Sequence, residues 1–576
     1  YQKLVRKLKQ LTDRSLSISL DNRIKKINYV VRGWVNYFRI ANMKNKIKQY
    51  LAAGLLVSIT GCTDLDVNIK SQYTEFPDSE IAAEAKLADT YYAFRNALGR
   101  RYNDLQSFSS DEFSGISFDG DYWNNGENAF PTLHSLTPDD VSVGWWPEDL
   151  TGGITKCNSV ILELGGDEVE TTAPAVAMRA FYHFILMDQF GDTPILDRKI
   201  GENEAIDRSP RAKVAEFIEQ DLQKALPGLS KQTGAATYGK PNYWMAKALL
   251  AKLYINWNVY TCGDVATYTP ETINPKLNDC IAICDEIIQS GLFNLQDSYR
   301  EKFWPENGPH IKDFIYAMPY DRITQQGMTY ARFRTWRQAN KMDPCYYGFK
   351  LEASVGGNMA INPHFVDLFC LEGDERNKVI IGGPIFNFDN NRNLTNEPCM
   401  YNGEQLVFTK EITLLEKDRM QLNTGKTVTG WSQGYKSVKW FPHHDDYLNG
   451  RNQSNDVPIF RYADILLTKA EAILRGGTAT LGDTPQSLMN QIREYVHAPQ
   501  ISSNPTLQDL LDERGREFFD ENWRRNDLIR FGKFEDDWGF KHILNPNAKN
   551  EKWRRIFPIH TEIMNKNTNW KQNYGY

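Results

Sequence analysis

The sequence predicts a mostly helical protein in which helical hairpins stack at both ends of the chain and large irregular insertions lie between them. Apolar residues recur with a period near 3.6 in long segments toward both ends. Several of these segments carry alanine where neighbouring helices would come close, as in stacked helical-hairpin repeats. The region of about 292–455 lacks this period and is rich in Gly, Asn, Asp and aromatic residues. We therefore expect one helical body with long insertions and a few short strands.

Five helices are predicted before the irregular region. The first, residues 80–98, follows a capping signal at Asp78 and Ser79. The other four are residues 178–195, ended by Gly191 and Pro194; residues 211–229; residues 242–257, with Trp244 and Ala248 on one face; and residues 278–291, capped by Asn278. Within the irregular region, residues 313–320 and 404–415 have the composition of strands.

Three further helices are predicted after the irregular region, at residues 460–474, 485–496 and 507–532. The last one carries charges of both signs at i, i+3 and i+4 spacing, which favours ion pairs on a helix surface over a catalytic role. These charges are Asp512, Glu513, Arg514, Arg516 and Glu517.

Residues 43–61 have the pattern of a bacterial lipoprotein signal peptide. Three lysines precede an apolar run from Tyr50 to about Thr60, which is too short for a membrane span. The sequence Ile-Thr-Gly-Cys at 59–62 resembles a lipobox, where cleavage leaves cysteine first and its thiol takes a diacylglycerol. We therefore expect lipidation of Cys62, whose acyl chains would anchor the protein to a membrane. The alternative is a short buried helix with Cys62 as a core thiol.

Residues 1–42 have a different character from the rest of the chain. They hold ten basic and two acidic residues, and the stretch Gly33 to Phe38 (GWVNYF) resembles the maturase domain of group II intron-encoded proteins. We interpret them as a remnant fused upstream of a start at Met43, outside the mature protein; a basic RNA-binding arm is the alternative. Without residues 1–61 the net charge falls from −6 to −17, with 54 basic and 71 acidic residues, which disfavours nucleic acid as a ligand of the mature protein.

Five segments give the remainder of the chain a family resemblance. They are RAFYHFILMDQFGDTPI, GKPNYWMAKALLAKLYINW, DVPIFRYADILLTKAEAIL, LLDERGREFFDENWRRNDLIRFGKF and FPIHTEIMNKNTNWKQNYGY. In composition and order they resemble the SusD/RagB family of surface nutrient-binding lipoproteins of Bacteroidetes. The resemblance implies one SusD-like glycan-binding domain at 62–576, with a helical part at about 62–300 and a loop-rich RagB/SusD part at about 301–576.

The resemblance also implies a function and partners. It implies a tetratricopeptide-like scaffold and a lipid anchor in the outer membrane, with the protein facing outward. The implied activity is non-catalytic capture of oligosaccharides for a SusC-type TonB-dependent transporter. Peptide binding, as in the RagB branch, is one alternative. A surface glycoside hydrolase is another, and it would need two carboxyl groups about 5–10 Å apart.

Sugar binding requires flat apolar ring faces together with planar polar groups for hydroxyls. Residues of these types gather in turn-rich stretches, where plain turns and loop packing are the alternatives. For Trp145 and Trp146 we expect one ring to pack against the next helix and the other to be exposed. The candidates are Asp111, Asp119, Asp121, Trp123 and Asn124; Trp145 and Trp146; Tyr330, Trp336, Arg337, Tyr346 and Tyr347; and Tyr447.

No cofactor is expected. A structural calcium ion is compatible with the acidic residues at 111–124, but the EF-hand spacing is absent. The run His443-His444-Asp445-Asp446 resembles a metal cluster, but adjacent residues of an extended loop point opposite ways, so we expect a solvated turn. The sequence contains neither HExxH nor GxSxG, which favours a binding protein over an enzyme.

Overall fold

The structure is a computed structural model that describes residues 80–576 except 120–126, 202–203 and 449. The chain divides into two compact units, Tyr1–Ala85 and Lys86–Tyr576. Only residues 80–85 of the first unit are described, so the account below concerns the second. The predicted remnant, the signal peptide and Cys62 lie outside the described residues, as do the candidates Asp121, Trp123 and Asn124.

Helices make up most of the regular structure, which confirms the predicted fold class. Their bounds are α4 (Glu80–Ala88), α5 (Arg95–Leu98), α6 (Arg101–Phe108), α8 (Ala129–Thr132), α9 (Trp146–Glu163), α10 (Ala173–Phe190), α11 (Arg211–Ala225), α12 (Tyr243–Ile255), α13 (Trp257–Thr261), α14 (Leu277–Gln289), α15 (Ala331–Arg334), α16 (Pro363–Val366), α17 (Val428–Trp431), α18 (Tyr462–Leu474), α19 (Pro485–Tyr495), α20 (Leu507–Glu517), α21 (Arg524–Arg530), α22 (Lys541–Leu544) and α23 (Thr561–Lys566).

The strands are short and pair in twos. Their bounds are β1 (Phe113–Gly115), β2 (Phe314–Met318), β3 (Met359–Ile361), β4 (Ile380–Ile381), β5 (Gly383–Pro384), β6 (Phe386–Phe388), β7 (Leu394–Pro398), β8 (Met400–Tyr401), β9 (Glu404–Gln405), β10 (Val407–Phe408), β11 (Lys436–Ser437) and β12 (Val457–Arg461). Each sheet among the described residues has two antiparallel strands, in the pairs β1–β3, β2–β12, β4–β11, β5–β10, β6–β7 and β8–β9.

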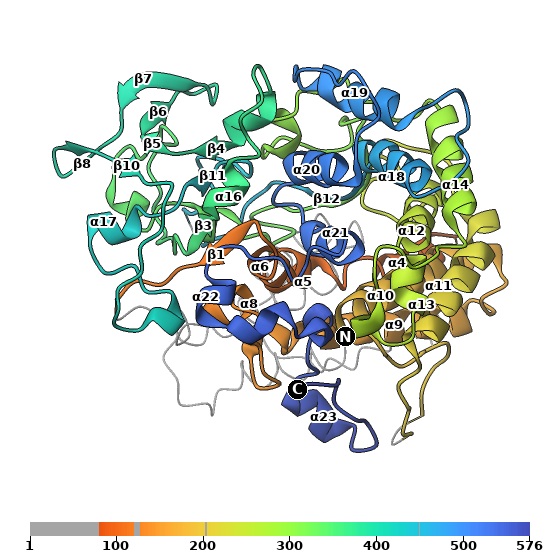
Figure 1. Ribbon diagram of the computed structural model, residues 1–576. Helices are drawn as coiled ribbons and strands as arrows, with labels where there is room; N and C mark the ends of the chain where they lie inside the picture. The colour runs from red at the N-terminus through yellow and green to blue at the C-terminus, as the bar shows by residue number, and fades with distance from the viewer. Residues whose placement is uncertain (1–79, 120–126, 202–203, 449) are drawn as a thin grey trace, which may run out of the picture. The chain divides into compact units, whose positions relative to one another are not determined.

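The long helices form an array in which each packs on its neighbours. Helix α10 lies between α9 and α11, and α14 lies between α12 and α18, which in turn packs on α19 (Figure 1). Helices α14 and α18 are neighbours although one ends at Gln289 and the other begins at Tyr462. The chain therefore leaves the array after α14, builds the loop-rich region, and returns at α18.

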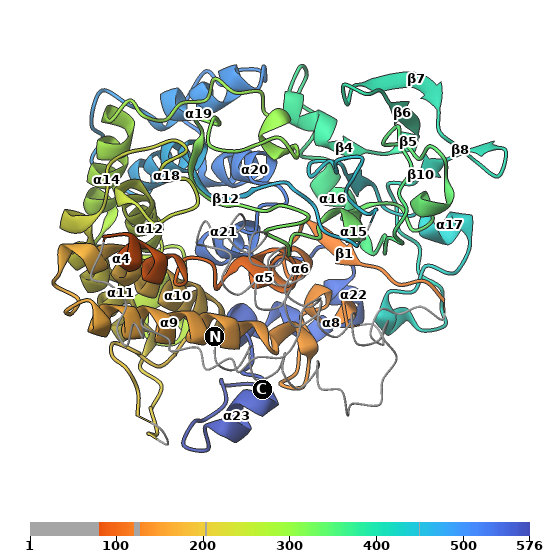
Figure 2. The ribbon, with the colours of Figure 1, turned by 180° about the vertical axis from the view of Figure 1, so that it is seen from behind.

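Strands β2 and β12 lie near the two ends of the loop-rich region and pair with each other, with Val457 opposite Met318 and Arg461 opposite Phe314. The small strands β5–β8 and β10 gather at the end of the unit away from α9, α11 and α14 in both views (Figures 1 and 2). We call residues 331–447 the loop-rich lobe. A second hydrophobic core lies within this lobe, separate from the main core of the helical array. Part of the irregular region therefore packs around its own core, while other residues of the region, such as Tyr299 and Trp440, belong to the main core.

Several predicted helix boundaries differ from the structure. Residues 80–98 form α4 and α5 with turns between them, and 507–532 form α20 and α21. The second break falls where Asp520 and Asn522 adopt positive φ angles of 62° and 72°. Asn278 does not cap α14; its side chain accepts a hydrogen bond from the amide of Thr478 instead (2.9 Å).

The predicted surface ion pairs of α20 are mostly buried, which corrects the expectation. Arg514 pairs with Asp464 of α18 and Asp527 of α21, at 2.8 Å each, and the carboxylate of Glu517 contacts Arg461 and Arg376. These charges join separate elements because α20 lies inside the molecule. Within the described part of the chain, none of the helices combines the length and the apolar character that crossing a bilayer requires.

Candidate ligand-binding surface

Asp111 is a structural residue, which corrects its prediction as a sugar ligand. Its buried carboxylate receives two hydrogen bonds from Arg524, from Nε and Nη2, each 2.8 Å long. Burial opposes ionisation of Asp111, but the charge and hydrogen bonds of Arg524 outweigh it and hold the pKa of this carboxyl well below its usual range. Asp111 therefore fastens the start of β1 to α21.

Five of the predicted sugar-contacting aromatic residues have almost no exposed surface. Tyr330, Trp336, Tyr346, Tyr347 and Tyr447 are each at most 2% exposed. Trp336 donates from Nε1 to Ser432 Oγ (3.1 Å), and its backbone amide donates to the Tyr346 hydroxyl (3.0 Å). Rings enclosed in this way offer no face to a ligand. Their prediction is corrected because four of these residues build the core of the loop-rich lobe and the fifth, Tyr330, packs in the main core.

Trp145 and Trp146 divide as expected, one ring inside and one outside. Trp146 is fully buried and donates from Nε1 to the Ser142 carbonyl (2.9 Å), whereas Trp145 is 45% exposed. They stand at the start of α9, in the helical array, so Trp145 belongs to a different part of the molecule from the lobe.

Two aromatic rings that the sequence did not single out lie on Trp336. Tyr401 and Trp431 are both half-buried, and their ring centroids lie 4.9 Å and 6.2 Å from that of Trp336, with interplanar angles of 77° and 76°. These edge-to-face contacts with the buried Trp336 restrain the orientations of the Tyr401 and Trp431 rings. A lone tryptophan in the Gly- and Thr-rich run before Ser432 was the signal that could have indicated Trp431.

Charged residues directly follow Trp336 and Phe118 in the chain, and Trp431 packs on both of these residues. Arg337 follows Trp336; its guanidinium is 5.8 Å from the Phe118 ring and donates to the Val355 carbonyl (3.2 Å). Trp431 packs on the same small cluster as Phe118. Asp119 lies 3.5 Å from Lys417 Nζ, and both side chains are exposed to solvent, by 44% and 73%. We call Tyr401, Trp431, Arg337, Asp119 and Lys417 the aromatic surface.

The order of the chain explains how this surface forms. Strand β1 pairs with β3, and the next residues run toward the loop that precedes α17, where Ser117 forms a bridge with Asn423 (Figures 1 and 2). The amide of Ser117 donates to the Leu422 carbonyl, and the amide of Thr424 donates to Ser117, each at 3.0 Å. Two distant segments are thereby joined just before Asp119. Of the predicted residues, Asp119 follows Phe118 in the chain, and Arg337 follows Trp336 and has its guanidinium 5.8 Å from the Phe118 ring.

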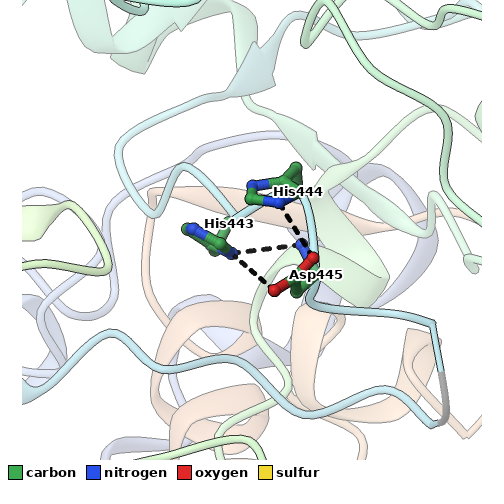
Figure 3. Close-up of side chains that lie close together, drawn as sticks. All are labelled: His443, His444 and Asp445. Carbon is green, nitrogen blue, oxygen red and sulfur yellow. Dashed lines mark hydrogen bonds and ion pairs between the residues drawn. The ribbon is translucent and has the colours of Figure 1, made fainter.

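His443, His444 and Asp445 converge, contrary to the expectation that they point apart (Figure 3). The two imidazole centroids are 4.0 Å apart, and His444 Nε2 lies 2.9 Å from the Asp445 carboxylate. The groups are already occupied, since His443 Nδ1 accepts from the Asp445 amide (3.1 Å) and Arg322 pairs with the Asp445 carboxylate (2.8 Å). The Arg322–Asp445 ion pair and these hydrogen bonds thus account for the convergence of the three residues.

Family models match three parts of the chain. Residues 312–576 match the SusD family, residues 65–255 match a family described as starch-binding and associating with the outer membrane, and residues 1–53 match the maturase-specific domain of group II introns. The last match agrees with the resemblance of residues 1–42 and extends into the predicted signal peptide.

Individual relatives agree with these matches. The Starch-binding protein SusD of Bacteroides thetaiotaomicron is 33% identical over 155 residues, 26% of this chain and 27% of that protein. The aligned part thus spans about a quarter of that relative. A SusD-like protein of Bacteroides ovatus is 24% identical over 567 residues, 92% of this chain and 89% of that protein.

Solved structures show the same fold. A laminarin-binding SusD-like protein superposes with a TM-score of 0.62 at 21% identity, covering 86% of this chain and 100% of that one. Surface glycan-binding protein A of Bacteroides uniformis gives a TM-score of 0.64 at 17% identity, covering 86% and 99%. These two proteins therefore share the fold of this chain, a helical array with a loop-rich region. The part of this chain from residue 312 to residue 576 belongs to the SusD family.

Proposed function

We propose that this chain is a non-catalytic receptor that binds oligosaccharides at the aromatic surface, outside the cell. The observation that carries the proposal is the match of residues 65–255 to a family described as starch-binding and associating with the outer membrane. The lipobox at Cys62 supplies a means of attachment to that membrane. Transfer of the bound glycan to a SusC-type TonB-dependent transporter completes the proposal.

The chemistry of the aromatic surface supports glycan binding. Trp431 and Tyr401 offer apolar ring area to the C–H face of a sugar, and the enclosed Trp336 restrains both rings before a ligand arrives. Arg337, Asp119 and Lys417 supply hydrogen-bonding groups around the rings. The combination of an apolar platform with a few fixed polar groups suits a ring-shaped ligand that carries many hydroxyls.

Calorimetric titration with maltoheptaose and laminarihexaose tests the proposal, because starch and laminarin are the glycans for which two relatives are named. Trp431→Ala should weaken binding by about 1–3 kcal/mol, the range of an aromatic hot spot. Trp145→Ala is the matched control, an exposed tryptophan outside the aromatic surface, and should bind as the wild type does. Loss of binding in Trp145→Ala alone would move the site to α9.

The ligand class and the absence of catalysis need separate measurements. Binding of a peptide library in the absence of binding to any oligosaccharide would replace the glycan with a peptide ligand. Release of reducing ends by the purified protein, lost on substitution of a single carboxylate, would identify a hydrolase instead.

Attachment and delivery are tested in the cell. Cys62→Ala should release the protein from the outer membrane, and mass spectrometry of the wild-type N-terminal peptide should find an acylated cysteine. Copurification with a membrane β-barrel in mild detergent should succeed for the acylated protein. An unacylated chain in the cytosol that retains residues 1–42 would refute the proposed attachment.

A further inference from the structure

A cavity of about 500 Å³ lies in the helical array, bounded by α9, the end of α10, residues 192–200 and 204–208, and the C-terminal segment that contains α23. Its volume falls within the range of small-molecule sites. The lining is mostly apolar and includes Leu186, Phe190, Leu196, Ile206, Ile563 and Trp570. None of these residues belongs to the aromatic surface.

Buried polar side chains hold the inner wall of this cavity in place. Asn158 Nδ2 donates to the carbonyls of Leu196 (3.0 Å) and Arg198 (2.9 Å). Arg179 Nη1 donates to the Asp197 carbonyl (2.8 Å), and the amide of Leu196 donates to His183 Nε2 (3.1 Å). Residues 196–198 of the segment that follows α10 are therefore held in place, and this side of the cavity is preformed.

The outer wall is fixed by contacts between the same segment and the C-terminal residues. Trp570 donates from Nε1 to the Ile206 carbonyl (2.7 Å), and Arg208 Nη1 donates to the Lys571 carbonyl (2.7 Å). Lys566 of α23 pairs with Glu148 of α9 at 2.5 Å. These contacts hold the C-terminal segment against Ile206, Arg208 and α9.

The charged side chains at the cavity have ion-pair or hydrogen-bond partners, whereas one hydroxyl has none. Glu204 pairs with Arg198 (2.5 Å), and Arg208 is bound by backbone carbonyls and by Asn573. Thr193 also lines the cavity, is only 5% exposed, and its Oγ1 has no hydrogen-bond partner. A buried polar group without a partner costs free energy, which a ligand group can recover.

We propose that this cavity binds an uncharged single-chain amphiphile, with its hydrocarbon chain in the apolar interior and its polar group at Thr193. Burying the chain removes apolar surface from water. A charged head group would lose its hydration. The lining groups that could neutralise it are already engaged: Glu148 and Glu204 in ion pairs, Arg208 by carbonyls and Asn573, and Asp192 by the amide of Arg211. The site is independent of glycan binding.

Calorimetry with 1-decanol as the probe tests the proposal on the full-length protein. We expect one molecule bound per chain, and at least tenfold weaker binding of decanoate and of decyltrimethylammonium. Absence of decanol binding, or equal affinity for either charged probe, would overturn the proposal.

Gly152 allows the cavity to be blocked without disturbing its walls. It lines the cavity from α9, and a Cβ at this position would meet no atom within 4 Å. Gly152→Phe should abolish decanol binding, whereas the matched control Gly152→Ala should retain it. Thr193→Val should weaken decanol binding about three- to tenfold, the value of one neutral hydrogen bond. Full decanol affinity in Gly152→Phe would place the probe elsewhere and refute the site.

Discussion

Arg461 and Glu521 form a two-point ion pair inside the protein. Arg461 Nε and Nη2 donate to the two carboxylate oxygens of Glu521 at 2.8 Å and 2.9 Å, and both side chains are about 2% exposed. The same guanidinium donates from Nη1 to Asp313 (2.6 Å) and Glu517 (2.8 Å). It therefore joins the end of β12, the start of β2 and the end of α20, where the helical array meets the loop-rich lobe.

Replacement of Arg461 by Met should destabilise the protein strongly. Three carboxylates would lose their shared cation while remaining buried, and breaking a buried pair on one side costs about 3–5 kcal/mol. Urea unfolding at pH 7 measures the loss. Lys213→Met is the control, because its pair with Glu216 lies at the surface with side chains 64% and 43% exposed, and it should leave the midpoint unchanged. Equal midpoints for the two variants would contradict a structural role for Arg461.

Glu112 should make stability fall as the pH rises through neutrality. Burial raises the pKa of its carboxyl from 4.5 to about 8, and the nearby charges of Asp520 and Asp111 add to the effect. Between these pH values the unfolded chain ionises while the folded protein keeps the proton, so stability is lost as the pH rises. Glu112→Gln can still accept from the Asp520 amide, which donates to Glu112 Oε1 at 2.7 Å, and it cannot titrate.

The difference between Glu112→Gln and the wild type isolates this effect from other titrating groups. The variant should match the wild type near pH 4.5 and exceed it by roughly 3–5 kcal/mol above pH 8, the linkage equivalent of the shift. Urea unfolding at several pH values gives the curve. A constant difference across the range would mean that Glu112 is ionised in the folded protein.

The helical array was predictable because its information is local. The apolar period of residues 178–190 and the stop at Gly191, where φ is 73°, are sufficient to predict α10. The break between α20 and α21 was not predictable, since the amide of Asp520 is held by Glu112, 408 positions away. No local pattern specifies a turn that depends on so distant a carboxylate.

The exposure of individual aromatic residues in the irregular region was not predictable from the sequence. The composition of this region indicated aromatic and charged residues such as Trp336, Arg337 and Asp119, and their role in ligand binding stays a prediction. Which ring faces outward depends on how the lobe packs its own core. Trp336 is buried and packs against Trp431, which is half-buried. The amino-acid composition of the region does not indicate which of the two tryptophans is buried.

Trp336→Ala should therefore act first on stability. The ring is completely buried, and its removal leaves a large cavity that costs about 3–5 kcal/mol. Trp336→Phe should cost less and should weaken oligosaccharide binding only slightly, through looser support of Trp431 and Tyr401. Thermal unfolding and calorimetry on the same samples separate the two effects. Wild-type stability combined with complete loss of binding in Trp336→Ala would mean that this ring contacts the ligand directly.

His183 should give a pH dependence of the opposite sign to that of Glu112. Burial lowers the pKa of His183 to about 4, and its Nδ1 lies 2.8 Å from the Arg179 carbonyl, which fixes a neutral tautomer that accepts from Leu196 at Nε2. Below about pH 6.5 His183 binds a proton in the unfolded chain but stays neutral in the folded protein. The free energy of unfolding therefore decreases as the pH falls toward 4, by up to about 3 kcal/mol. His183→Gln keeps an acceptor and cannot titrate, so its stability relative to the wild type should rise on acidification from pH 7 to pH 4.5, as measured by urea unfolding. Parallel curves for the two proteins would show that His183 does not titrate differently in the folded state.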